Sequence, residues 1–177
     1  MGSKVKEIEG GVCAPEGFVA AATSCGIKNP DIYRLDLALI YSEHPTVGAA
    51  VFTQNEVCAA PVRLSSSYLK SAEPRAIIVN SGNANACTGH AGMLHARTMA
   101  IATAKSLGLK QQEVQISSTG SSGVPLPIER IEPKIGELAE SLDCDCDPAA
   151  QAIMTSDTRP KSVAVTVKIG NKKVKIG

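Results

Sequence analysis

The stretch Ala76-Ile-Ile-Val-Asn-Ser-Gly-Asn-Ala-Asn-Ala-Cys-Thr-Gly89 passes without transition from an apolar run into ten small and polar residues. Residues 76–79 are typical of a buried strand, and a helical pattern follows the loop at 80–89. Loops at the carboxyl end of a strand are where α/β proteins place groups that contact ligands. A second polar loop, 117–123, follows the apolar residues 114–116 in the same way. Two such loops on successive strands predict a site.

The elements around these loops predict an α/β fold. Apolar side chains recur at helical spacing over 93–107, and Gly108 is placed to end that helix. Strand 76–79, helix 93–107 and strand 113–117 then form a βαβ unit, which implies parallel neighbouring strands. We expect a layered sheet-and-helix domain, and the 177 residues fit a single domain over 1–177.

The remaining predicted elements lie on both sides of this unit. In chain order they are a strand at 37–41, a strand at 49–53, a helical stretch ending near Lys70, a helix over 128–142 that Pro133 divides, and a short helix at 149–154. Alternating apolar residues over 163–169, a Gly170-Asn171 turn and apolar residues at 174 and 176 predict a C-terminal β-hairpin.

Composition and charge exclude several classes of protein. Apolar residues make up 44% and charged residues 20%, as in globular chains. Aromatic residues are only 3% and the net charge is +1, which argues against a nucleic-acid binder. No apolar run is long enough to span a membrane, and the start at Met1 lacks the apolar core of a signal peptide. We therefore expect a cytoplasmic protein, or one of an organelle's matrix, with no nucleic-acid or membrane partner.

Six cysteines in such a compartment predict free thiols rather than a disulfide framework. Cys144 and Cys146 stand in an acidic segment that could suggest a metal site. No CxxC pair and no His cluster accompanies them, so a solvated acidic loop is favoured and no metal is expected. The other four lie among small apolar residues and are expected to be buried: Cys13, Cys25, Cys58 and Cys87.

The two loops could support several kinds of chemistry. Gly82, Gly89 and Gly92 do not make a GxGxxG fingerprint, which leaves a nucleotide-binding module as a minor alternative. The serines lack a Gly-x-Ser-x-Gly elbow, and neither His90 nor His95 has a recognisable orienting acid. Ser118-Thr119-Gly120 after a strand can present two adjacent amides that stabilise an anion. From local pattern alone an ordinary loop before a helix is favoured over this anion site, so pattern alone indicates only a small-molecule α/β protein with a site built from loops.

A series of longer motifs carries the interpretation further, in this order along the chain: Ala14-Pro-Glu-Gly-Phe18, Cys25-Gly-Ile-Lys28, Asp36-Leu-Ala-Leu-Ile40, Val51-Phe-Thr-Gln-Asn55, Ala59-Ala-Pro-Val62, the loop 80–89, Ser118-Thr-Gly120, Gly123-Val-Pro-Leu-Pro127 and Met154-Thr-Ser-Asp-Thr-Arg-Pro-Lys161. Together they resemble the ornithine acetyltransferase family, the glutamate N-acetyltransferases of arginine biosynthesis. The resemblance implies a precursor that cuts itself before a Thr into an α chain and a β chain. The N-terminal Thr of the β chain is then the nucleophile, with its own α-amine as base.

This resemblance implies a reaction and a set of site residues. Acetyl passes from N-acetylornithine to that Thr and then to glutamate, a ping-pong scheme without a cofactor in which acetyl-CoA is an alternative donor. Thr119 and Gly120 form the oxyanion hole, and Thr158 contacts substrate. The family's Lys-Gly-Ser-Gly-Met segment and its cleavage site would follow Gly177, so we expect an α chain that lacks the nucleophile. The implied architecture is N-terminal-Thr hydrolase-like, completed by a β chain in an (αβ)2 or higher oligomer. A non-catalytic ligand-binding fragment is the other alternative.

Overall fold

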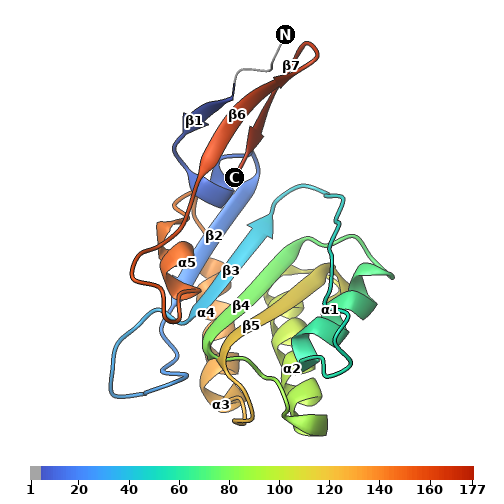
Figure 1. The fold of residues 1–177 in the computed structure, drawn as a ribbon, viewed down its shortest axis with the longest axis vertical. Helices are drawn as coiled ribbons and strands as arrows, with labels where there is room; N and C mark the ends of the chain where they lie inside the picture. Colours follow the sequence, from blue (N-terminus) through green and yellow to red (C-terminus); the bar gives the residue numbers. More distant parts are fainter. Residues whose placement is uncertain (1–4) are drawn as a thin grey trace.

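The computed structural model describes residues 5–177 as two sheets, with helices packed on the larger one (Figure 1). The larger sheet has the order β2-β3-β4-β5. Its strands are β2 (Phe18–Thr23), β3 (Leu37–Ser42), β4 (Ala76–Asn83) and β5 (Val114–Ser121). The smaller sheet has the order β1-β6-β7 and projects from one end of the larger. Its strands are β1 (Lys6–Ile8), β6 (Ala164–Ile169) and β7 (Lys172–Ile176). Residues Met1 to Lys4, the start of the segment that lacks a signal-peptide pattern, lie outside the described residues.

The predicted βαβ unit is confirmed by β4, α2 (Gly89–Leu107) and β5. β4 and β5 pair in parallel from Ala76 opposite Val114 to Asn83 opposite Ser121. Gly108 caps α2 in the left-handed conformation (φ 66°), as its place in the pattern predicts. A short 3-10 turn, η2 (Gln111–Glu113), then leads into β5.

Helices cover the two faces of the larger sheet unequally. One face carries α2, α3 (Ile128–Ile131), η3 (Glu132–Lys134) and α4 (Ile135–Glu140), and Pro133 divides this helical region as predicted. The main core lies on this face and includes Leu37, Leu39, Ile78, Met99, Val114, Ile131, Ile135 and Leu138. On the other face α5 (Asp147–Ala152) packs alanines against Ala20 and Ala38, near η1 (Gly11–Cys13).

The outer edge of β5 is covered by α1 (Ala60–Leu69), the helical stretch that the sequence predicts to end near Lys70. The Ser65 hydroxyl donates to Ile116 O at 2.9 Å and accepts the Ile116 N–H at 2.8 Å. One buried serine thus satisfies the backbone at an edge that pairs with no further strand of residues 5–177.

Some predicted elements differ from those observed. The predicted strand 49–53 is wrong, because residues 47–54 are irregular and Val51 is 99% exposed. Both edges of β3 are already paired, by β2 and β4, so this segment has no free edge beside the strand it follows. The strand β2 was not predicted, because its run Phe-Val-Ala-Ala-Ala-Thr shows no alternation of apolar and polar residues. The C-terminal hairpin is confirmed, and β1 extends it to a third strand.

The six thiols are all free, but their burial differs in part from the prediction, since Cys13, Cys25 and Cys58 are only partly buried. Cys87 is exposed although it lies among small residues, because it sits in the loop that precedes α2. Cys146 is buried rather than solvated, and its Sγ donates to Gly10 O at 3.2 Å.

In residues 5–177 no group of three or more His, Cys, Asp or Glu side chains is placed to hold a metal ion. Over the same range no helix is both long and apolar enough to cross a membrane.

The thiols should therefore differ in reactivity. Burial raises the pKa of Cys25 to about 12 and that of Cys13 to about 11, so both hold little thiolate at pH 8. We expect iodoacetamide at this pH to label the exposed Cys87 and Cys144 first. Peptide mass spectrometry after timed quenching checks the order, and labelling in guanidinium should make all sites react alike. Faster labelling of Cys25 than of Cys87 would contradict the partial burial of Cys25 and the exposure of Cys87.

Candidate functional site

The carboxyl ends of β4 and β5 meet at two glycines that face each other in register, Gly82 and Gly120. Gly120 has φ +137°, which other residues rarely adopt. A Cβ on Gly120 would lie 2.5 Å from Asn83 N and 2.8 Å from Gly82 Cα, and closer still to the Gly82 carbonyl carbon. The prediction that Ser118-Thr119-Gly120 follows the strand is wrong, because β5 continues through Ser121. The oxyanion residues proposed from the sequence therefore lie within the sheet, at its close-packed end.

The loop predicted at 80–89 is wrong in its first part, because β4 continues through Asn83. The asparagines of this segment hold this end of the sheet together. Asn80 accepts a hydrogen bond from Ser118 Oγ at 2.5 Å and donates to Asn83 O at 2.8 Å. The Asn83 side chain accepts the Asn85 N–H at 2.8 Å. Asn85, at φ 46°, donates to Gly92 O in the first turn of α2 at 2.9 Å. All three asparagines are buried, which indicates a scaffold beside the site rather than a set of ligand contacts.

A buried carboxylate fixes the loop that enters the site from β2. Asp36 accepts the N–H of Cys25 at 2.6 Å and that of Ile27 at 2.7 Å. Its own backbone oxygen accepts the Ser81 N–H at 2.8 Å, which joins this loop to β4. Lys28 directly follows Ile27, and these contacts bring it beside Gly82.

A cleft lies against these strand ends, in two parts that share Lys28, Arg34 and Gly82. One part, of about 340 Å³, is completed by Gly120, Ser121, Thr155 and Ser156. The other, of about 440 Å³, is completed by Asn29, Ile32, Asp36 and Ser81. The volume suits a small molecule.

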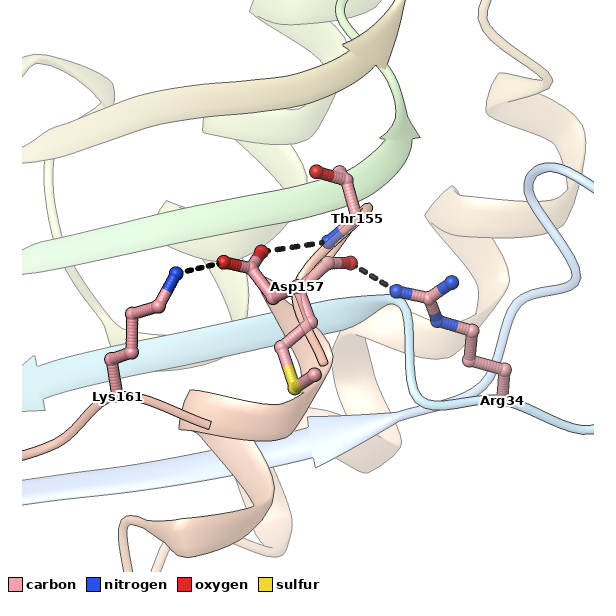
Figure 2. A network of polar contacts seen from close by, with 5 residues as sticks. Arg34, Thr155, Asp157 and Lys161 are labelled. Carbon is pink, nitrogen blue, oxygen red and sulfur yellow. Dashed lines mark hydrogen bonds and ion pairs between the residues drawn. The ribbon is translucent and has the colours of Figure 1, made fainter. Parts of the chain in front are cut away.

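The segment 154–161 forms one wall of the cleft and is tied to the loop before β3 (Figure 2). The Arg34 guanidinium donates to Met154 O, which is adjacent to Thr155. The Thr155 N–H in turn donates to an Asp157 carboxylate oxygen at 3.3 Å. Lys161 pairs with the other oxygen of Asp157, and the hydrogen bond from Lys161 lowers the pKa of that carboxyl. These contacts give an exposed segment a defined shape.

The structure brings together some of the residues singled out in the sequence. Gly120 lines the cleft, and Thr119 is half-buried directly before it on β5. Thr158 is exposed, and its neighbours Thr155 and Ser156, rather than Thr158 itself, line the cleft. Lys28 and Arg34 were missed, although the motif Cys25-Gly-Ile-Lys28 places a cation directly after the residues that Asp36 binds.

Comparison with known proteins identifies the family of this chain. The model of the ArgJ family matches residues 19–177. The chain belongs to the ArgJ family. Among curated ArgJ relatives, the arginine biosynthesis bifunctional protein ArgJ of Symbiobacterium thermophilum is 44% identical over 171 residues, which cover 96% of this chain and 42% of the relative. That of Geobacter sulfurreducens is 48% identical over 156 residues, which cover 88% of this chain and 39% of the relative. The chain thus spans about two fifths of the length of these ArgJ proteins.

Solved ArgJ structures match the fold closely. The crystal structure of arginine biosynthesis bifunctional protein ArgJ from Bacillus halodurans has a TM-score of 0.92 at 32% identity, covering 99% of this chain and 92% of that chain. Ornithine acetyltransferase from Mycobacterium tuberculosis, solved in complex with ornithine, has a TM-score of 0.87 at 38% identity, covering 97% and 93%. The arrangement of mixed sheet and helices is therefore that of ArgJ proteins.

Proposed function

We propose that this chain is the α subunit of a glutamate N-acetyltransferase that serves arginine biosynthesis. Acetyl moves from N-acetylornithine to the N-terminal Thr of a β chain and from there to glutamate. The observation that carries the proposal is the small-molecule cleft at Gly120 in a chain with ArgJ relatives at 44–48% identity. The solved neighbour complexed with ornithine supports a substrate of this class.

The coverage of the relatives supports a division into two chains. This chain matches about two fifths of each curated ArgJ protein, yet it covers 92–93% of the individual chains in the solved structures. Self-cleavage of a longer precursor accounts for both figures. The β chain would then bring the nucleophile to the cleft and complete an N-terminal-Thr hydrolase-like architecture, with (αβ)2 or a higher oligomer as the assembly. We further propose a cytoplasmic enzyme that needs no cofactor, and a substrate contact by Thr158.

The oxyanion hole can be built from one amide and one hydroxyl. Successive N–H groups of a strand point to opposite edges, so two adjacent amides of β5 do not converge on one oxygen. The Ile116 N–H points to the outer edge, where Ser65 accepts it, and the alternation directs the Gly120 N–H to the same edge. Thr119 lies directly opposite Ser81 in the parallel pairing of β4 and β5, so the two side chains are on the same face of the sheet. Ser81 lines the cleft on this face. The Gly120 amide and the Thr119 hydroxyl are therefore the two donors we propose.

This assignment predicts different effects for two substitutions of Thr119. Thr119→Ala removes the hydroxyl and should lower kcat about 10²-fold, the usual cost of losing one oxyanion donor. Thr119→Ser keeps the hydroxyl and should remain within about tenfold of the parent enzyme. Steady-state kinetics of acetyl transfer to glutamate give both values. Equal activity of the two variants would assign the second donor to a different group.

The proposal is tested by a mass spectrum and an assay of the protein purified after expression of its whole gene. We expect the α chain to co-purify with a second chain that begins with Thr. The complex should carry out exchange of acetyl between N-acetylornithine and ornithine without glutamate, as a ping-pong mechanism requires. A single uncut polypeptide, or transfer that requires both substrates to be bound at once, would contradict the proposal.

A further inference from the structure

Two cationic side chains line the cleft beside Gly120 without a carboxylate of their own. Lys28 and Arg34 border both parts of the cleft. Within residues 5–177 neither forms an ion pair, since the ion pairs there involve Lys134 and Lys161. An acid in the same lining, Asp36, already accepts two backbone N–H groups at 2.6 Å and 2.7 Å.

One further polar group of the cleft, the Ser81 hydroxyl, has no hydrogen-bond partner within residues 5–177. Ser81 is 1% exposed, and its Oγ makes no hydrogen bond to any residue in 5–177. It lines the same part of the cleft as Lys28 and Arg34. A buried hydroxyl without a partner costs about 1–3 kcal/mol, and a ligand that supplied the missing hydrogen bond would offset this cost.

We infer that Lys28, Arg34 and Ser81 bind the α-carboxylate of the amino-acid substrate. A guanidinium offers a planar fork of donors to a carboxylate, an ammonium adds a point charge, and a hydroxyl donates one further hydrogen bond. The inference rests on the proposed function, in which N-acetylornithine and glutamate occupy one site in turn. The α-carboxylate is the charged group that both substrates share, so a single binding site serves both half-reactions.

The contact that Arg34 makes in the structure links the proposed carboxylate site to the wall formed by the segment 154–161. Its Nη2 donates to Met154 O, and Figure 2 shows the side chain reaching from the loop before β3 to the segment that carries Thr155. Thr155 and Ser156 line the cleft next to Gly120. Binding of a carboxylate by Arg34 is therefore coupled to the position of the wall nearest the proposed oxyanion hole.

The first test is kinetic and uses the complete two-chain enzyme. We expect Lys28→Gln and Arg34→Gln each to raise KM for both substrates about 10- to 100-fold, with a smaller effect on kcat, because each removes one charged hydrogen bond. Arg34→Lys should recover part of the loss. Lys70→Gln, an exposed change at the end of α1, is the matched control and should leave KM unchanged. Normal KM values in both Gln variants would overturn the inference.

The second test identifies the carboxylate and separates a binding role from a structural one. The parent enzyme should acetylate glutamine, which keeps the α-carboxylate, far better than isoglutamine, in which the α-carboxylate is replaced by an amide. The double variant Lys28→Gln with Arg34→Gln should lose that preference. Ser81→Ala should raise KM while leaving the urea midpoint of unfolding unchanged or higher, because the hydroxyl has no partner to lose. A preference for the α-amide, or a preference that the double variant keeps, would place the carboxylate elsewhere. Absence of a second chain or of any acetyl transfer by the parent enzyme would instead contradict the proposed function.

Discussion

Gly120→Val is expected to abolish both self-cleavage and acetyl transfer. A side chain at this position would meet the backbone of β4, with its Cβ 2.5 Å from Asn83 N, and the backbone at φ +137° disfavours a β-branched residue. The two strands must separate or β5 must turn, and either movement displaces the Gly120 amide. Loss of one oxyanion donor alone costs about 10²–10³ in rate. We propose that the Gly120 amide serves the self-cleavage as well as the acetyl transfer, so both reactions should be lost.

The experiment compares two glycines of different surroundings. Gly136 lies in α4, where a Cβ would meet no atom within 4 Å, so Gly136→Ala should keep full activity and gain about 0.5–1 kcal/mol of stability. Gly120→Ala should already impair self-cleavage, measured as the fraction of uncut precursor on a denaturing gel. Circular dichroism establishes whether the uncut variant retains the fold. A folded Gly120→Val enzyme that matures and turns over normally would remove Gly120 from the proposed oxyanion hole.

Asp36→Ala is expected to destabilise the chain by about 3 kcal/mol or more. The substitution leaves the N–H groups of Cys25 and Ile27 without their acceptor, and each unsatisfied buried donor costs about 1–3 kcal/mol. The loop that carries Lys28 should also lose its fixed position, so substrate affinity should fall together with stability. Urea unfolding monitored by circular dichroism measures the first effect, and KM measures the second.

Two further substitutions serve as controls for Asp36→Ala. Asp31→Ala changes an exposed acid of the same segment and should alter stability by no more than about 0.5 kcal/mol. Asp36→Asn keeps one acceptor oxygen and should fall between the parent and Asp36→Ala. A stability loss in Asp36→Ala no larger than that in Asp31→Ala would show that the two amide contacts contribute little.

The features of the fold that the sequence predicts correctly are those set by local pattern. The helical repeat before Gly108 and the alternation around Gly170 each arise from residues close together in the chain, and both predicted elements are present. The lengths of β4 and β5 depend instead on pairing between distant residues. Small and polar residues at 80–83 and 118–121 have weak strand preference, but the partner strand and the Asn80–Ser118 hydrogen bond keep them extended.

The site was predictable only in part for the same reason. Thr119 and Gly120 were proposed by resemblance, and the cleft at Gly120 agrees with a site there, although the donor roles remain a prediction. Lys28 reaches the cleft because Asp36 accepts the N–H of the preceding residue, Ile27. Arg34 is held there by its hydrogen bond to Met154 O. Such contacts between residues far apart along the chain leave no periodic signal in the sequence.

The small sheet has a consequence for the order in which the chain folds. β1 pairs with β6 so that Lys6 lies opposite Thr166, two residues 160 positions apart along the chain, whereas the larger sheet is complete once Ser121 has been made. Contacts of such high sequence separation form slowly, because loop closure must precede them. We expect the larger sheet to assemble first during synthesis and the ends of the chain to join it last. In hydrogen exchange, amides of β6 should accordingly open more readily than those of β4.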